Sequence, residues 1–205
     1  MESILKSIKT KKIPINPAIV ISNKIDAKGL MIAKKMGVNV EIIESKNFKG
    51  TRAEFDEKIM NTLVKYGVTP RNGLVCLAGF MRIISPEFVK KYKNKIINIH
   101  PALLPAFPGL NSQKQALDYG AKYSGCTVHF VDAGMDTGAV IIQAIVEIKN
   151  KDTEKSLSKK ILKEEHRIYP QAVNLFARKK NQSFRKKNNN QLIIRSTKKI
   201  QYLEF

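Results

Sequence analysis

The sequence predicts an α/β fold in which helices flank a mostly parallel β-sheet. Apolar runs rich in β-branched residues alternate along the chain with amphipathic segments, which is the pattern expected when helices connect parallel strands. A chain of 205 residues, 43% of them hydrophobic, is long enough to bury one sizeable core. We therefore expect one domain over residues 1–177 and a basic C-terminal tail over residues 178–205.

Each expected element follows from its local pattern. Short β-branched runs predict strands at residues 18–22, 40–43, 73–78, 95–99, 126–131 and 140–146. Amphipathic periodicity predicts helices at residues 3–10, 27–36, 51–66, 86–92, 112–119 and 153–176. The last two strands are joined by a short glycine-containing connection, which favours an antiparallel hairpin at the edge of the sheet.

Helix start and stop signals support these boundaries. Asp26 and Ser85 are expected N-caps, because a short polar side chain there can accept a free backbone N–H of the first turn. Pro86 stands at a first helical position, where a missing N–H costs no hydrogen bond. Helix ends are expected at the glycines Gly37, Gly67 and Gly120.

The formal net charge of +20 is shared between the domain and the tail. The tail has nine Lys or Arg against one acidic residue, so it contributes +8 and the domain contributes +12. Lysines such as Lys90 and Lys91 follow helical segments, without the interleaved aromatic residues of an RNA-binding platform. Solvated basic surfaces that attract small anionic substrates are therefore favoured over nucleic-acid binding. The apolar patch at residues 192–194 predicts a final edge strand or a disordered extension.

Nothing in the sequence points to export or to a membrane. Residues 1–12 lack the apolar centre of a signal peptide, and no run approaches the roughly 18 apolar residues of a membrane span. Cys76 and Cys126 stand singly in strand-like runs, without the spacing of a metal site or of a disulfide framework. We expect a cytoplasmic protein with two buried, reduced cysteines.

The most informative stretch is residues 97–105, which sets Asn98 and His100 at the end of an apolar run. Side chains two residues apart on a strand share a face. The amide and the imidazole can therefore reach one reacting carbonyl together, the first as a hydrogen-bond donor and the second as a proton carrier. A second stretch, residues 127–138, runs into an acidic, glycine-containing loop that offers a carboxylate to orient His100.

Six motifs occur in order along residues 4–177: Ile-Ser-Asn-Lys at 21–24, Leu-Ala-Gly-Phe-Met-Arg-Ile at 77–83, Asn-Ile-His-Pro-Ala-Leu-Leu-Pro-Ala-Phe-Pro-Gly at 98–109, Val-His-Phe at 128–130, Met-Asp-Thr-Gly at 135–138 and Glu-His-Arg-Ile-Tyr-Pro at 165–170. Together they resemble the folate-dependent phosphoribosylglycinamide formyltransferases of purine biosynthesis. The resemblance implies a Rossmann-like formyltransferase fold.

The resemblance also implies a reaction and its catalytic residues. The amine of glycinamide ribonucleotide would attack the formyl carbon of the co-substrate 10-formyltetrahydrofolate, and Asn98 with protonated His100 would stabilise the oxyanion. His100 would then pass a proton to the departing folate nitrogen. Asp136 would hold the imidazole and favour its charged form. No metal, membrane or nucleic acid is expected among the partners, and the protein is expected to be a monomer or a homodimer.

The binding residues come from the same resemblance. The residues implied to contact the formyl donor are Arg52, Met81, Arg82, Ile83, Ile84, Asn98, Asp132, Ala133, Gly134, Met135 and Asp136. Among them, Arg82 would suit the anionic tail of the folate. Glu165 matches a residue that contacts the nucleotide substrate, whereas His129 is expected to be structural.

Two related classes share the same Asn-His-Asp chemistry. Formyltetrahydrofolate hydrolases typically place a second His after the catalytic one and carry an additional N-terminal domain. Methionyl-tRNA formyltransferases have a different Arg-Gly signature after this motif and a C-terminal tRNA-binding domain. Here Pro101 follows His100 and the motif ends in Phe107-Pro108-Gly109, so the nucleotide transformylase is favoured and the hydrolase stays an alternative.

The beginning of the sequence departs from the family. The family opens with an apolar strand and a Gly-Ser-rich turn whose N–H groups bind the substrate phosphate. Here the segment that begins at Met1 matches the helix after that turn, and no glycine precedes Gly29. We expect that strand and phosphate loop to be lacking and the true start to lie upstream. The alternatives are a catalytically impaired remnant, a basic nucleic-acid-associated protein, or compensation by the 192–194 patch inserting as a strand.

Overall fold

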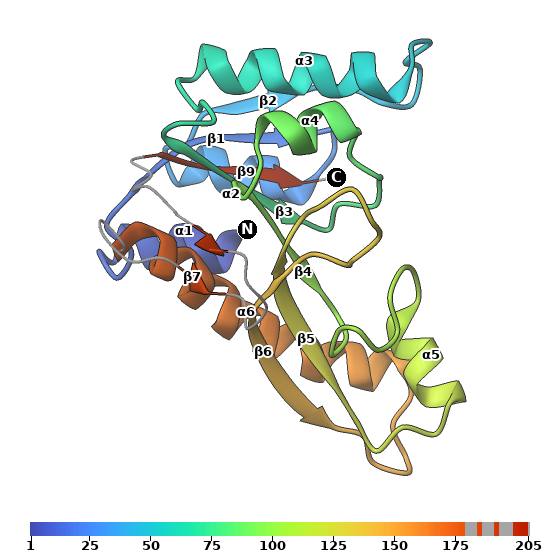
Figure 1. Cartoon of the computed structure of the whole chain (residues 1–205). Helices are drawn as coiled ribbons and strands as arrows, with labels where there is room; N and C mark the ends of the chain where they lie inside the picture. The colour runs from blue at the N-terminus through green and yellow to red at the C-terminus, as the bar shows by residue number, and fades with distance from the viewer. Residues whose placement is uncertain (179–183, 186–190, 193–198, 205) are drawn as a thin grey trace.

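The computed structural model describes residues 1–178 in full, and beyond them the backbone of three short strands at 184–185, 191–192 and 199–204. A seven-stranded sheet runs through the molecule in the order β2-β1-β9-β3-β4-β5-β6 (Figure 1). Its strands are β1 (Asn16–Ser22), β2 (Val40–Ile42), β3 (Gly73–Ala78), β4 (Ile96–His100), β5 (Tyr123–Phe130), β6 (Val140–Glu147) and β9 (Lys199–Glu204). The five strands from β2 to β4 pair in parallel, whereas β5 is antiparallel to both of its neighbours.

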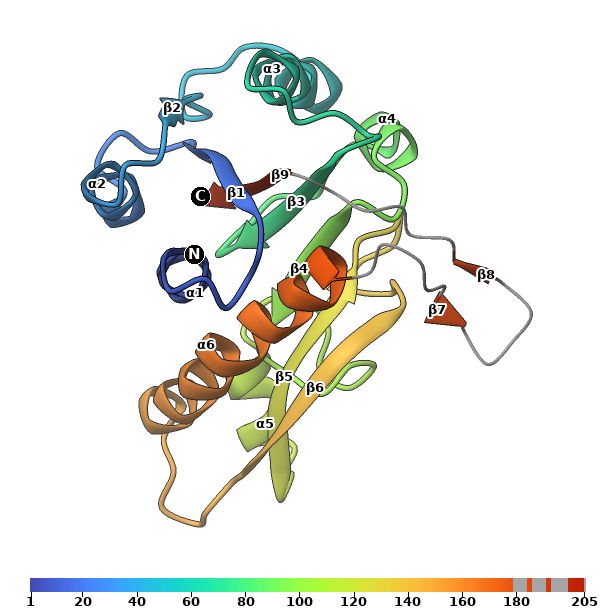
Figure 2. The same cartoon turned by 90° about the vertical axis from the view of Figure 1, so that its left-hand side faces the viewer.

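Helices cover both faces of the sheet, as Figure 2 shows. The helices are α1 (Glu2–Lys9), α2 (Lys28–Lys35), α3 (Arg52–Lys65), α4 (Pro86–Lys91), α5 (Ser112–Asp118) and α6 (Glu154–Arg178). Side chains of α1, α2 and α6 share one apolar core with the sheet, and side chains of α3 and α4 share a second core on the opposite face. Within the part of the chain described, no helix is long and apolar enough to cross a membrane.

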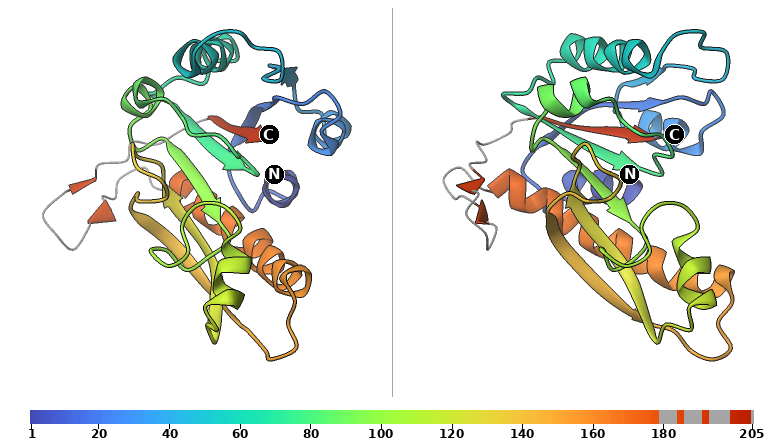
Figure 3. Two further views of the ribbon diagram at one scale, coloured as in Figure 1. Left: turned by 90° about the vertical axis from the view of Figure 1, so that its right-hand side faces the viewer. Right: turned by 45° about the vertical axis from the view of Figure 1, so that its right-hand side comes forward.

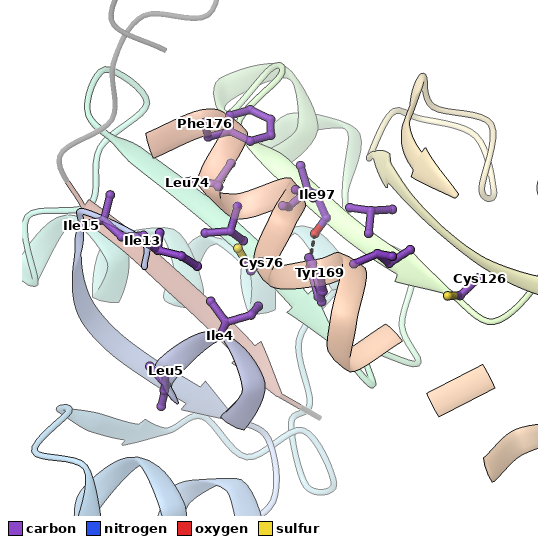
Figure 4. Close-up of a cluster of buried hydrophobic side chains, with 14 of the residues drawn as sticks. Ile4, Leu5, Ile13, Ile15, Leu74, Cys76, Ile97, Cys126, Tyr169 and Phe176 are labelled. Carbon is purple, nitrogen blue, oxygen red and sulfur yellow. Dashed lines mark hydrogen bonds between the residues drawn. The ribbon is translucent and has the colours of Figure 1, made fainter. Parts of the chain in front are cut away.

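The larger core lies between α1, α6 and the middle of the sheet (Figure 4). Ile4 of α1 and Phe176 of α6 are fully buried in it, as are both cysteines, which are reduced. The Tyr169 hydroxyl lies 2.7 Å from the Leu77 carbonyl oxygen and 3.1 Å from the Ile97 carbonyl oxygen, and so links α6 to both β3 and β4. This contact fixes α6 behind the strand that carries Asn98.

The expected helices and the six expected strands are confirmed, with ends that differ by up to three residues. Ser85 caps α4, with Pro86 at its first position, and Gly37, Gly67 and Gly120 follow helices with positive φ. The expectation for Asp26 is wrong. The cap of α2 is Ala27, whose carbonyl accepts the N–H of Leu30, so Asp26 lies one residue too early to serve the first turn.

The end of the chain supplies a central strand, which the sequence reasoning did not predict. β9 lies between β1 and β3, in parallel register with both. The patch expected to insert was 192–194, but Leu192 belongs to β8 (Gln191–Leu192), which pairs with β7 (Phe184–Arg185) in a separate two-stranded ladder, and residues 193–194 lie outside the described part. A strand between β1 and β3 satisfies the backbone groups on the facing edges of both, which an edge strand would not.

Figure 3 shows that the carboxyl end of β9 and the amino end of α1 lie near each other at the same edge of the sheet. β9 thus occupies the interior position at which the family resemblance expects a first strand leading into this helix. The division of the chain at residue 177 stays a prediction, and the pairing of β9 joins the last residues to the sheet of the domain.

Candidate active site

Asn98 and His100 lie on β4, at the junction between the parallel and the antiparallel parts of the sheet. Because they are two residues apart on a strand, their side chains share one face. In the ladder with β5, Asn98 stands opposite His129 and His100 stands opposite Thr127. The hairpin of β5 and β6 therefore brings its own polar side chains to the two residues that the sequence singled out.

Both ring nitrogens of His100 face hydrogen-bond acceptors. Nδ1 lies 3.3 Å from Oδ2 of Asp136, and Nε2 lies 2.9 Å from the carbonyl oxygen of Phe107. A neutral imidazole carries one N–H and can serve one of these partners, whereas the imidazolium can donate to both. The surroundings of this buried ring therefore offer an acceptor to each of its nitrogens.

Asp136 is held by the loops on either side of it. Its Oδ2 also accepts the N–H of Gly109 at 3.0 Å, and Oδ1 lies 3.6 Å from Nε2 of His129. Gly109 has a φ of 77°, a conformation that favours glycine, and Asp136 itself has a φ of 55°. The backbone turn at each residue thus directs a donor and an acceptor toward each other.

His129 is a partner of Asn98 that the sequence reasoning assigned only a structural role. Its Nδ1 lies 2.8 Å from the Phe130 carbonyl oxygen, which can only accept, so Nδ1 carries a proton. In the neutral ring, Nε2 is then left to accept from the Asn98 amide nitrogen at 3.3 Å. Burial lowers the pKa of His129 and so favours this neutral form, although the Phe130 carbonyl and Asp136 act in the opposite direction.

This contact fixes which way the Asn98 amide points. One amide hydrogen is directed at His129, and the second remains for another acceptor. The signal that predicts the contact is the alternation in Thr127-Val128-His129, which places His129 on the same face of the sheet as Asn98 once β4 and β5 are antiparallel neighbours.

The residues expected to bind a formyl donor occupy two loops and a helix end. Met81 and Ile83, on the loop between β3 and α4, are 73% and 56% exposed, whereas Ile84 is 7% exposed and belongs to the core. Arg82 lies over the ring of Phe55, with 4.5 Å from its guanidinium carbon to the ring centroid. Arg52 is exposed at the first turn of α3.

The acidic loop that leads to Asp136 is exposed for most of its length. Asp132 closes the loop by accepting the N–H of Gly134 at 3.1 Å and the hydroxyl of Thr137 at 2.7 Å. Ala133 and Met135 are exposed beside it, and Asp136 is mostly covered. The loop thus exposes the apolar side chains of Ala133 and Met135 and turns the carboxylate of Asp136 toward His100.

Glu165 stands apart from this group, on α6. Burial raises its pKa to about 7, and the positive charge of the Met1 amino group acts in the opposite direction.

Two surface hollows, of about 600 and 500 Å³, are lined by other residues, among them Lys122 and Glu147 in the first and Glu41 and Lys58 in the second. The structure thus brings Asn98, His100 and Asp136 together and leaves Glu165 outside their contacts.

Comparison with known proteins gives these observations a context. The sequence matches the formyl transferase family over residues 1–173. The phosphoribosylglycinamide formyltransferase of Escherichia coli K12 is 38% identical over 177 residues, a match that covers 86% of this chain and 81% of that protein. The trifunctional purine biosynthetic protein adenosine-3 of Gallus gallus is 42% identical over 177 residues, and the chain spans 17% of its length.

Solved structures agree with the sequence matches. The glycinamide ribonucleotide transformylase 1 of Symbiobacterium toebii superposes with a TM-score of 0.85 at 42% identity, covering 94% of this chain and 87% of that one. The phosphoribosylglycinamide formyltransferase of Bacillus halodurans gives a TM-score of 0.81 at 35% identity, covering 88% and 90%. The fold implied by the motifs and the resemblance to these enzymes are both confirmed, and nothing in the comparisons favours a hydrolase or a nucleic-acid-associated protein. The chain belongs to the formyl transferase family.

Proposed function

We propose that this chain transfers the formyl group of 10-formyltetrahydrofolate to the amine of glycinamide ribonucleotide, in purine biosynthesis in the cytoplasm. The observation that carries the proposal is the arrangement of Asn98, His100 and Asp136, in which both nitrogens of His100 face acceptors. Such a ring can be positively charged before a substrate binds, and a positive charge is what a developing oxyanion requires.

Asn98 and His100 act on the reacting carbonyl. As the substrate amine adds to the formyl carbon, the carbonyl oxygen becomes an oxyanion, which accepts the free amide hydrogen of Asn98 and the Nε2–H of His100. In the structure that Nε2–H is directed at the Phe107 carbonyl, so a substrate oxygen takes the place of a weaker, neutral acceptor. Asp136 stays on Nδ1 and keeps the ring oriented and charged.

Collapse of the intermediate needs two proton transfers. The bond between the formyl carbon and the folate nitrogen breaks as the oxyanion re-forms the carbonyl, the folate nitrogen takes a proton from His100, and the attacking amine gives up a proton to solvent as it becomes an amide. The neutral His100 can be protonated again from solvent. The carboxylate of Asp136, on Nδ1, keeps the ring oriented while the proton returns.

The exposed loops supply the donor site. Met81, Ile83 and Met135 present apolar surface where the pterin can stack, and neither loop is part of a helix or strand, so both leave backbone groups to bind a heterocycle. Arg82 and Arg52 offer positive charge to the anionic tail of the folate. Glu165 is proposed to contact the nucleotide substrate, and its raised pKa suits a carboxyl group that donates or accepts a hydrogen bond near neutral pH.

The test is formyl transfer by the purified chain, with formylglycinamide ribonucleotide and tetrahydrofolate both measured as products. We expect the two products in equal amounts, and a loss of about a hundredfold or more in kcat for His100→Ala and Asp136→Asn. Glu164→Gln, a half-buried position on α6 whose carboxylate pairs with Arg167, is the matched control and should retain full activity. Tetrahydrofolate and formate formed without the nucleotide would instead indicate a hydrolase, and absence of turnover with salt-sensitive binding to DNA or RNA would indicate a nucleic-acid-associated remnant.

A further inference from the structure

The loop from Gly79 to Ser85 connects β3 to α4 and contains neither helix nor strand. It presents Met81 and Ile83 to solvent, while Ile84 and Ser85 turn inward. A loop with two exposed apolar side chains holds them in place only if its backbone is anchored elsewhere. The anchor at its end is a carboxylate on α3.

That carboxylate is Asp56, which is 1% exposed. Its Oδ2 accepts the backbone N–H of Ser85 at 2.5 Å. The Ser85 hydroxyl in turn accepts the N–H of Phe88 at 3.3 Å and so caps α4. One bond from Asp56 therefore fixes the point at which the loop ends and the next helix begins.

The same carboxylate also acts on the arginine of the loop. The positive charges of Arg82 and Arg52 both favour the ionised form of Asp56. Phe55, the residue before Asp56, carries the Arg82 guanidinium over its ring. The start of α3 thus holds Arg82 by contact with an aromatic face, and the neighbouring Asp56 carboxylate adds a favourable charge.

Placing a carboxyl group here is unfavourable for stability. Burial raises the pKa of Asp56, while the hydrogen bonds from Ser85 and the two arginines only partly offset that effect. The neighbours Phe55 and Ile59 are apolar core residues, so an apolar side chain would pack at this position without the cost of desolvation. What an apolar side chain would not provide is the bond to Ser85.

We propose that Asp56 is a positioning residue for the formyl-donor site, setting the loop from Met81 to Ile84 and the direction of Arg82. The inference rests on the proposed function, in which this loop receives the donor. Within the described residues, Asp56 has no hydrogen bond or ion pair with Asn98, His100 or Asp136, which belong to β4 and to the hairpin. Its influence therefore falls on binding of the donor and spares the chemical step.

The experiment compares Asp56→Asn and Asp56→Ala in steady-state formyl transfer, with each substrate varied in turn. We expect the KM for 10-formyltetrahydrofolate to rise about tenfold for Asn, which keeps one acceptor oxygen, and further for Ala. The kcat and the KM for glycinamide ribonucleotide should stay within about twofold of the wild type. Asp152→Asn is the matched control, since Asp152 has a side chain only 8% exposed and, like Asp56, accepts a backbone N–H, that of Lys149 in the turn before α6.

A second measurement needs no substrate. Hydrogen exchange of residues 79–85 should become faster in both Asp56 variants and stay unchanged in Asp152→Asn, while β4 keeps its protection. Should Asp56→Ala fail to fold, Asp56→Asn carries the test, because it has nearly the same volume. A wild-type chain without transfer activity would refute the proposed function and leave the exchange result to decide whether Asp56 holds the loop. Equal rises in both KM values, a fall in kcat alone, or unchanged exchange in the loop would overturn the inference.

Discussion

The parallel and the antiparallel parts of the sheet are completed by strands from different places in the chain. In the antiparallel part, β5 and β6 follow each other in the chain and pair along most of their length. In the parallel part, β1 and β3 do not pair with each other, because β9 from the far end of the chain lies between them. The catalytic group draws on both, since Asn98 and His100 end a parallel strand while His129 and Asp136 belong to the hairpin and its loop. This site therefore depends on one strand pairing that is local in sequence and on one that joins distant parts of the chain.

The largest loss of stability should come from removing β9, the strand from the far end of the chain. Deleting residues 199–205 leaves six positions on β3 and six on β1 without their β9 partner. Each buried backbone group left unpaired costs about 1–3 kcal/mol, against a total stability of about 5–15 kcal/mol. We therefore expect the deleted chain to lose its cooperative thermal transition, measured by circular dichroism, and to lose amide protection in β1 and β3.

A control separates the strand from the segment that leads to it. Replacing residues 186–190 by Gly and Ser at the same length leaves β9 present and should leave the transition temperature nearly unchanged. A deleted chain that melts at the wild-type temperature would show that β9 contributes nothing to the parallel part.

The next largest loss of stability should come from a substitution in the hairpin of β5 and β6. A Cβ added to Gly138 would lie 1.7 Å from the carbonyl oxygen of Phe130, a backbone atom that cannot move without opening the hairpin. Gly138→Ala should therefore cost about 3–5 kcal/mol in the free energy of unfolding and displace the nearby Asp136. We expect formyl transfer to fall at least as far as in Asp136→Asn, when both are measured at a temperature where the variant is folded.

Gly120→Ala is the matched control for this substitution. Gly120 has a φ of 73°, but its added Cβ would meet no atom within 4 Å. Its cost should be that of backbone conformation alone, about 1 kcal/mol, with activity unchanged. Similar losses in the two variants would mean that the close approach to Phe130 is not what holds the hairpin loop.

The sequence predicts the locally formed parts of this molecule and misses the pairing that joins distant segments. Local patterns predict the helices, the hairpin and the strand that carries Asn98 and His100, because periodicity, caps and glycine stops act within a few residues. The insertion of β9 has no local signal, since a strand's pattern does not specify its neighbours and the apolar patch at 192–194 was the more conspicuous candidate.

Within the site, contacts that depend on local spacing are predicted, and contacts that depend on register or packing are not. The spacing of Asn98 and His100 on a strand predicts that they share a face, and the motif resemblance brings Asp136 to them. The contact between His129 and Asn98 depends on the register between β4 and β5, and the bond from Asp56 to Ser85 depends on the packing of α3 against a loop. Neither register nor packing can be read from one segment of sequence alone.

A smaller effect tests how the hairpin supports the segment that follows His100, at Ala102 and Leu104. The buried Thr127 hydroxyl accepts the N–H of Leu104 at 3.0 Å and the side-chain amide of Gln143 at 3.0 Å, and it donates to the carbonyl of Ala102 at 2.6 Å. Thr127→Val keeps the shape and removes all three bonds, so we expect a loss of about 2–3 kcal/mol in urea denaturation and a lower kcat. Thr127→Ser keeps the hydroxyl and should retain most of both quantities; an equal loss in the two variants would assign the effect to packing.

The smallest expected effect is a dependence of stability on pH that comes from α6, the helix that packs on both parts of the sheet. Burial raises the pKa of Glu165 to about 7, above its value in the unfolded chain, so the native state holds this proton more tightly. Stability is therefore fully present below the unfolded pKa and falls as the pH rises through 7. Glu165→Gln removes the titration, and it should be more stable than the wild type by about 1–2 kcal/mol at pH 8 and nearly equal to it at pH 4. Urea denaturation of both proteins across this range measures the difference. Glu164→Gln, which removes a half-buried partner of Arg167, should not show the trend. Curves for Glu165→Gln and wild type that stay parallel from pH 4 to 8 would contradict a raised pKa of Glu165 in the folded chain.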